Sequence, residues 1–206
     1  MEAPKVILSE AERLLINNAD IILTKNSCIE KISNQFGLAA AVYQQLCEPL
    51  KSKYPGLFNI HPKISKGEKH SGLPWIMLDY PRSFDKETGQ LAIRTFFWWG
   101  NFFSIQLQVS KTYLPLVVRA LSSWQVKRNE WFIGLTDNAW DMELPNPRWL
   151  DIEKTNISDT NNEALVLKLA KKIPIAQWEN SEINFSKDYA ELVELITIAL
   201  SAQPVK

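Results

Sequence analysis

Two histidines and several carboxylates are the side chains best suited to acid–base or metal chemistry. His61 and His70 lie nine residues apart, and Asp79 follows after nine more. Asp137 and Asp141 come directly after an apolar run that predicts a strand. Paired carboxylates at such a place can act as general acid and base or bind a divalent cation. The candidate catalytic residues of a hydrolase-like or metal-assisted enzyme are therefore His70, Asp79, Asp137 and Asp141.

These residues match no established metal-binding motif. Zinc and iron sites hold several ligands on rigid elements, whereas both histidines fall in an expected loop. The segment TDNAWDMEL lacks the calcium-loop pattern, and Asp and Asn favour turns for purely local reasons. We expect no metal and no cofactor. The enzyme is kept as the alternative hypothesis, and it requires that the loops holding the four candidates converge.

The common signatures of catalysis are absent from the chain. The run from Gly67 to Gly72 has the glycine spacing of a phosphate loop, but Leu73 and Pro74 follow where Lys and Ser or Thr are needed. There is no G-x-S-x-G elbow and no dinucleotide fingerprint. Cys28 and Cys47 have no metal or redox spacing, which is typical of reduced core residues.

The most distinctive stretch is RTFFWWGNFFSI, at residues 94–105. Gly100-Asn101 predicts a two-residue hairpin loop, with Gly at the position that needs a positive φ. This loop sets a register in which Trp98 lies opposite Phe103 and Trp99 lies opposite Phe102. The expected hairpin has one face of core residues, which includes Trp98 and Phe103, and a second face of mixed character.

The second face combines large rings near the hairpin tip with polar side chains along the stem. We predict that it is a binding surface, with the residues Phe97, Trp99, Phe102 and Gln106. Three interpretations remain open: burial beneath residues 136–162 or a terminal helix, a surface for a protein partner or a second copy, and a small-ligand groove. Exposed apolar patches of a few hundred Å² usually mark interaction sites.

Composition and charge narrow the class of protein. The 206 residues are 46% hydrophobic and 22% charged, which is ordinary for a soluble globular domain. Twenty-three basic and 23 acidic residues cancel, so we expect neither a nucleic-acid partner nor a membrane association. The opening residues lack the features of a secretory signal, and no stretch has the length of a membrane span. We expect a cytoplasmic protein.

Periodicity and capping signals outline the elements that must position these residues. Ser9 with Glu12, and Ser27 with Glu30, match capping boxes and predict two helix starts. The following elements are also expected: a loop at 55–73, strands at 74–80, 91–99, 102–109 and 130–135, and helices at 110–124, 163–173 and 187–201.

The sequence predicts a single α+β domain over residues 1–206, with an antiparallel sheet of about four strands and about five helices. Its parts are an N-terminal helical segment (9–52), a sheet-containing core (73–135), an irregular acidic loop (136–162) and C-terminal helices (163–201). The function we expect is a non-catalytic binding or protein-interaction module, with a protein partner or homodimer as the possible partner.

Overall fold

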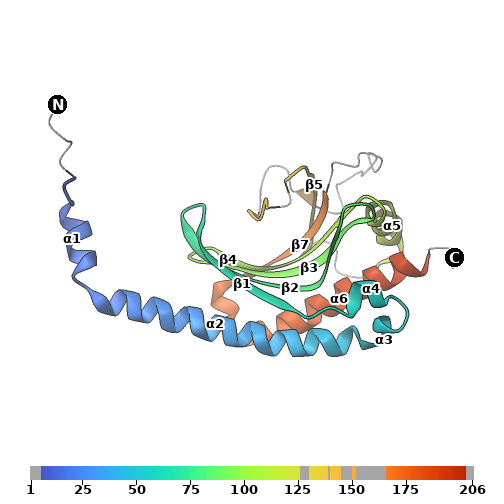
Figure 1. Cartoon of the computed structure of the whole chain (residues 1–206), viewed down its shortest axis with the longest axis horizontal. Coiled ribbons are helices and arrows are strands. Elements are labelled where there is room, and N and C mark those ends of the chain that lie inside the picture. Colours follow the sequence, from blue (N-terminus) through green and yellow to red (C-terminus); the bar gives the residue numbers. More distant parts are fainter. Residues whose placement is uncertain (1–5, 126–129, 139, 145–149, 152–165, 203–206) are drawn as a thin grey trace.

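An antiparallel sheet forms the centre of the molecule (Figure 1). The computed structural model describes residues 6–125, 130–138, 140–144, 150–151 and 166–202. Within these residues seven strands pair in the order β1-β2-β3-β4-β7-β5-β6. The strands are β1 (Lys63–His70), β2 (Leu73–Asp85), β3 (Gly89–Trp98), β4 (Phe102–Ser110), β5 (Phe132–Thr136), β6 (Leu150–Asp151) and β7 (Val166–Pro174).

Helices cover one face of this sheet, and Figure 1 shows α2 and α6 running along it. The main apolar core lies between that face and residues of α2, α5 and α6. The helices are α1 (Glu10–Ile16), α2 (Ala19–Leu46), α3 (Glu48–Lys51), α4 (Pro55–Phe58), α5 (Tyr113–Ala120) and α6 (Ser181–Ser201), with the 3-10 turns η1 (Leu121–Ser123) and η3 (Ile175–Asn180). The predicted α+β domain with an antiparallel sheet is confirmed.

One of the two predicted helix starts is correct. Glu12 N–H donates to Ser9 Oγ at 3.2 Å, and Ser9 N–H donates to Glu12 Oε2 at 2.6 Å, so the first capping box caps α1. The second start, at Ser27, is wrong because α2 runs without a break from its Asn18 cap. Apolar positions three and four apart from Ile32 to Tyr43 bury one stripe of this helix against the sheet.

The predicted register of the β3–β4 hairpin is wrong by one residue. Trp98 pairs with Phe102 and Phe97 pairs with Phe103, which leaves a loop of three residues, 99–101. Asn101 N–H donates to the Trp98 carbonyl at 3.0 Å, and Gly100 has φ 71°, a conformation that suits glycine. Gly100 therefore has the positive φ that was predicted, but it is the second residue of a three-residue loop and not the first of a two-residue loop.

Because of this shift, each β3 side chain shares a face with the β4 side chains that were predicted to lie on the opposite face. Phe97 and Phe103 lie together on the helix-covered face, where Phe103 meets Phe36 and Phe185 at ring distances of 6.4 and 5.6 Å. Phe36 and Phe185 are far from the hairpin in the sequence, so the residues of the turn alone could not reveal the register. The predicted second face, with Phe97 beside Phe102, does not form.

Two further segment predictions are wrong. Residues 55–73, expected to be a loop, contain α4 and the edge strand β1. Residues 163–173, expected to be a helix, contain β7 instead. Helix-forming residues are common in this segment, but β7 lies between β4 and β5 and gains a ladder on both sides, so tertiary pairing overrides local propensity. The parts of the predicted acidic loop at 139, 145–149 and 152–162 lie outside the described residues.

Candidate functional site

The sheet face opposite the helices carries a band of buried polar side chains. Strand pairing brings them together, since Asp79 lies opposite Arg94 and Gln108 lies opposite Lys168. The members of this polar band, each at most 6% exposed, are Asp79, Arg94, Ser104, Gln106, Gln108 and Lys168. Buried polar groups of this kind must be paired to be tolerated, so their partners decide what the band does.

Arg94 is the centre of the polar band. Its Nε–H donates to Asp79 Oδ1 at 3.0 Å, and its Nη1 group donates to Gln108 Oε1 at 3.0 Å. The guanidinium also lies over the rings of Phe84 and Trp140, at 5.5 and 5.2 Å from their centroids. Burial raises the pKa of Asp79, and the charge of Arg94 and its hydrogen bond oppose that rise. Arg94 therefore joins the sheet to the segment that contains Trp140.

Residues 140–144, which form part of the predicted acidic loop, cover the polar band and the rings beside it. Lys168 Nζ donates to the Asp141 carbonyl at 2.7 Å, and Gln108 Nε2 contacts Met142 Sδ at 3.7 Å. Met142 and Leu144 belong to a buried cluster that includes Phe102. The interpretation of burial beneath this loop is thus correct for Phe102. The polar stem residues are buried, and Gln108 contacts the cover directly, whereas Gln106 donates to Ser104 Oγ.

The structure places the four catalytic candidates in different surroundings. Asp79 is held by Arg94, and Asp137 is exposed just beyond the end of β5. His70 lies edge-on to the rings of Phe96 and Trp98, at 5.5 and 4.9 Å. Among the described residues, no group of three or more His, Cys, Asp or Glu side chains could hold a metal ion.

His70 and Asp141 are the two candidates that the structure does bring near each other. Burial lowers the pKa of His70, while the charges of Glu143 and Asp141 oppose that change. In the part of the chain that the structure describes, His70 Nε2 is buried without a hydrogen-bond partner. A neutral imidazole against aromatic rings fits a packing role, because such a site disfavours the charged form.

Lys168 provides a pH-dependent test of the polar band. Burial lowers its pKa to about 7, with Asp141 opposing the change and Arg94 adding to it. The unfolded chain therefore binds more protons between pH 7 and about 10.4, so stability should rise with pH across this window. Lys168→Met should remove this rise. Urea unfolding at pH 7, 8.5 and 10 measures this difference. Between pH 7 and pH 10 the free energy of unfolding of the wild type should rise by at least about 1.4 kcal/mol more than that of the variant. Parallel pH profiles would contradict the assignment.

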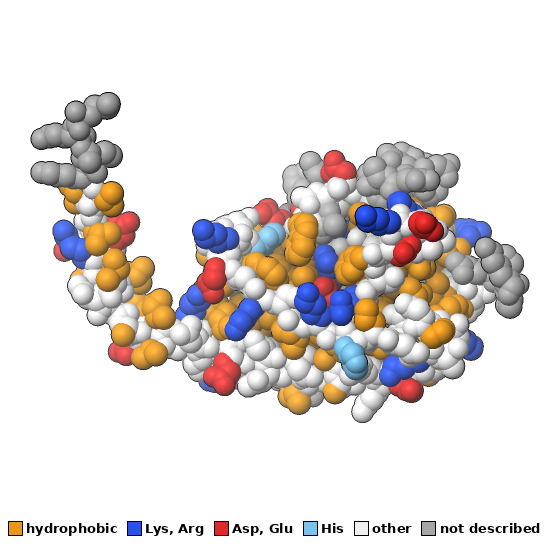
Figure 2. All heavy atoms as spheres, viewed as in Figure 1, with side chains coloured by type: hydrophobic (Ala, Val, Ile, Leu, Met, Phe, Trp, Pro, Cys, Tyr) orange, Lys and Arg blue, Asp and Glu red, His pale blue; other side chains and the backbone are white. Residues whose placement is uncertain are grey.

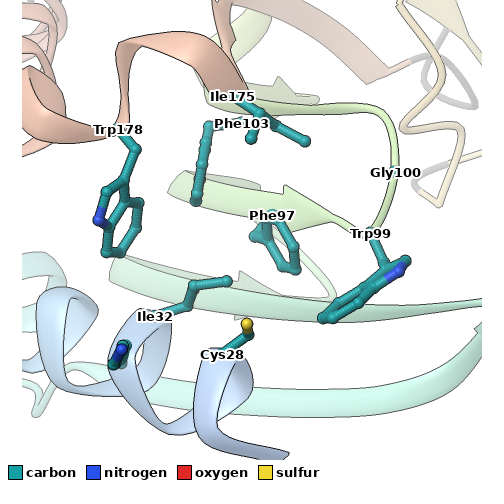
Figure 3. A pocket seen from close by; sticks show the side chains of 9 residues that line it. Cys28, Ile32, Phe97, Trp99, Gly100, Phe103, Ile175 and Trp178 are labelled. Atoms are coloured by element: carbon teal, nitrogen blue, oxygen red, sulfur yellow. The ribbon is translucent and has the colours of Figure 1, made fainter. Parts of the chain in front are cut away.

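The open apolar surface lies on the other side of the sheet, beside the β3–β4 turn (Figure 3). A pocket of about 420 Å³ is bounded by α2, this turn and η3. We call it the hairpin pocket, and its lining residues are Cys28, Lys31, Ile32, Phe97, Trp99, Gly100, Phe103, Ile175 and Trp178. Lys31 is the one charged residue among them.

Packed aromatic rings form the wall of the hairpin pocket. Phe97 meets Phe103 at 4.9 Å and Trp99 at 6.1 Å between ring centroids. Trp178, which comes from η3, stacks on Phe103 at 5.7 Å. Figure 3 shows these rings lining one side of the hollow, with Cys28 and Ile32 of α2 opposite them. The rings are supported from behind by the core, so the pocket is preformed.

A second hollow of about 660 Å³ adjoins the hairpin pocket and shares Cys28 and Trp99 with it. We call it the arm hollow, and its other lining residues are Asp20, Ile21, Ile22, Thr24, Lys25, Glu68, Gly72, Leu73 and Pro74. An ion pair of 2.6 Å between Lys25 and Glu68 links α2 to β1 here. The two hollows lie next to each other along the first half of α2, and we refer to them together as the groove; its lining is mainly apolar, with Asp20, Lys25 and Glu68 in the arm hollow.

The predicted binding residues divide between the two faces. Phe97 and Trp99 line the hairpin pocket, whereas Phe102 and Gln106 are buried on the opposite face. A role in binding remains a prediction for all four. Sequence reasoning missed Cys28, Ile32 and Trp178. The i, i+4 spacing of the first two marked a helical face, but nothing in the sequence linked that face to the hairpin.

Fold and site define this molecule as a single-domain α+β protein with an open apolar groove. No protein-family model, curated protein or solved structure matches the chain. In the described part of the chain, no helix has the length and apolar character needed to cross a membrane. Any functional conclusion therefore depends on the geometry of the groove and of the polar band.

Proposed function

We propose that this protein is a non-catalytic binding module and that the hairpin pocket is its binding site. The observation that supports this most is the pocket itself, which is open and almost wholly apolar although it adjoins a densely packed aromatic core. Its volume of about 420 Å³ falls within the range of known ligand sites, about 300–1,000 Å³. Burial of its rings by a ligand would supply the main binding energy.

The shape of the groove favours a protein segment over a compact small molecule. The hairpin pocket and the arm hollow share Cys28 and Trp99, so one elongated apolar segment can fill both. Amphipathic helices bind in grooves of this kind through apolar side chains on one face. Lys31 provides positive charge at the hairpin pocket, whereas Lys25 in the arm hollow is paired with Glu68.

The enzyme alternative has less support. Two of its candidates contact the polar band on the opposite face, where Asp79 accepts from Arg94 and the Asp141 carbonyl accepts from Lys168. Such contacts give these groups a structural role in holding residues 140–144. A cytoplasmic location also remains part of the proposal, since Cys28 and Cys47 are unbridged thiols.

The proposal is tested by measuring the binding of the fluorescent probe anilinonaphthalene sulfonate before and after chemical labelling of Cys28. Cys28 is half-buried in the pocket, whereas Cys47 is buried and burial raises the pKa of its thiol to about 11. A bulky maleimide should therefore react at Cys28 alone and block the pocket. We expect both the labelled protein and Trp99→Ala to bind the probe about tenfold more weakly.

The control is Leu38→Ala, which removes an exposed side chain from α2 away from the pocket and should leave probe affinity unchanged. Trp99 is only half-buried, so Trp99→Ala should shift the thermal midpoint by no more than about 2–4 °C. Unchanged probe affinity after labelling and in Trp99→Ala would overturn the proposal. A large loss of stability in Trp99→Ala would make Trp99 an ordinary core residue.

A further inference from the structure

The N-terminal arm, defined as residues 6–24, leaves its apolar side chains without cover. Every residue of the arm is exposed, and α1 buries none of its side chains. Figures 1 and 2 show it projecting beyond the sheet with hydrophobic side chains along its length. Its large apolar residues, between 43% and 95% exposed, are Val6, Ile7, Leu8, Leu14, Leu15, Ile16, Ile21, Ile22 and Leu23.

The arm needs a partner for physical reasons. α1 has seven residues, and isolated helices shorter than about 12–15 residues are marginal in water. In proteins such helices gain most of their stability from packing an apolar face. The arm makes an intact capping box and thus a defined helix start, yet within the described residues none of its side chains is buried.

We propose that the partner is a second copy of this chain and that two arms exchange in a two-fold dimer. This inference rests on the proposed function and names the segment that fills the groove. Ile21 and Ile22 of the arm are themselves walls of the arm hollow. An antiparallel arm from the second copy, led by Leu14 and Leu15, completes that hollow and reaches the hairpin pocket. Each copy gives one arm and receives one, so the interface is self-complementary and closed.

Charge favours the same arrangement. The arm carries Glu10, Glu12 and Asp20 against the single cation Arg13. Lys31 is exposed beside the hairpin pocket, which the incoming α1 would reach. Acidic residues of one copy are thus brought toward a basic residue of the other, which fixes the orientation of the arm more than it adds affinity.

The available area is sufficient for a stable dimer. Burying one Val, Leu or Ile side chain removes on the order of 60–120 Å² from water. Nine such side chains, each about half exposed or more, give roughly 500 Å² for each arm. Two arms alone give about 1,000 Å², and the grooves that they cover bring the total within the range of a standard specific interface, about 1,200–2,000 Å².

The test is sedimentation equilibrium of the full-length chain between 0.1 and 100 μM (about the range that separates nanomolar from weak micromolar dimers). We expect a dimer whose dissociation constant rises at least 100-fold in the triple variant Leu14→Ser, Leu15→Ser, Ile16→Ser. Circular dichroism should show that this variant keeps its sheet, because none of the three side chains is buried within the chain. The control is Leu38→Ser, which also changes an exposed apolar side chain but lies on α2 outside the arm. This variant should remain dimeric.

Crosslinking tests the site of docking. Leu15→Cys should form an intermolecular disulfide with Cys28 under mild oxidation, whereas Leu38→Cys should not. A monomer at all concentrations, or a dimer that survives the triple variant, would overturn arm exchange. So would a monomer that binds phosphatidylcholine vesicles through the arm, since the occupant would then be a lipid surface. Probe binding is also measured in the triple variant, because an incoming arm would otherwise occupy the hairpin pocket. Probe binding there that depends on Trp99 and Cys28 would leave the pocket assignment standing.

Discussion

Replacing Phe103 with alanine is expected to lower the free energy of unfolding by about 3–5 kcal/mol. Phe103 is 1% exposed, and its ring contacts those of Phe36, Phe97, Trp178 and Phe185. These rings come from α2, β3, η3 and α6, so one deletion removes contacts that join four elements to β4. Urea unfolding followed by circular dichroism measures the loss, with the slope of the transition as a check on two-state behaviour.

Phe84 is the matched control because it is a phenylalanine on the same sheet but is 52% exposed. Phe84→Ala removes one ring over Arg94 and should cost about 1 kcal/mol or less. Phe103→Leu keeps most of the volume and covers the case in which Phe103→Ala does not fold. Equal losses for Phe103→Ala and Phe84→Ala would contradict the hairpin register seen in the structure.

Replacing Arg94 with methionine is expected to cost about 3–5 kcal/mol at pH 7, because it leaves the Asp79 carboxylate buried without its cation. The double variant Arg94→Met, Asp79→Leu should recover much of this loss, since an apolar pair of similar size leaves no uncompensated charge. Lys51→Met breaks a surface pair with Glu48 and should change stability by less than about 1 kcal/mol. A double variant no better than the single one would argue against the pairing.

The loss in Arg94→Met should also depend on pH in a defined direction. Arg94 opposes the rise that burial causes in the pKa of Asp79, so its removal should raise that pKa further. A carboxyl with a raised folded-state pKa destabilises the fold increasingly as the pH rises above its unfolded-state pKa of about 3.9. The deficit of Arg94→Met relative to wild type should therefore be smaller near pH 4 than at pH 7. A constant deficit would assign the loss to packing against Phe84 and Trp140.

The two faces of the sheet differ in structure. On one side Arg94, Gln108 and Lys168 contact Trp140, Met142 and the Asp141 carbonyl, and so hold residues 140–144 against the sheet. On the other side, α2 and the hairpin tip leave an apolar groove beside a rigid aromatic wall. The aromatic-rich hairpin contributes to both, since consecutive side chains along β3 point to opposite faces.

The sequence by itself determined those elements whose formation depends on residues close together in the chain. The capping box at Ser9, the apolar stripe of α2 and the strands around Gly100 all follow from spacing within a few residues. The α+β class and the antiparallel sheet followed from these elements. Phe97 and Trp99 line the hairpin pocket and not the predicted face, and their role in binding stays a prediction.

Only the tertiary structure decided the register, the extra strands and the site. A slip of one residue exchanges the faces of β3, and the contacts that select the register come from Phe36 and Phe185. Likewise β7 is a strand because β4 and β5 flank it, although its residues suit a helix. The hairpin pocket joins Cys28 to Trp178 across 150 residues of chain. Such contacts depend on how distant segments pack, and that information is absent from any short stretch of sequence.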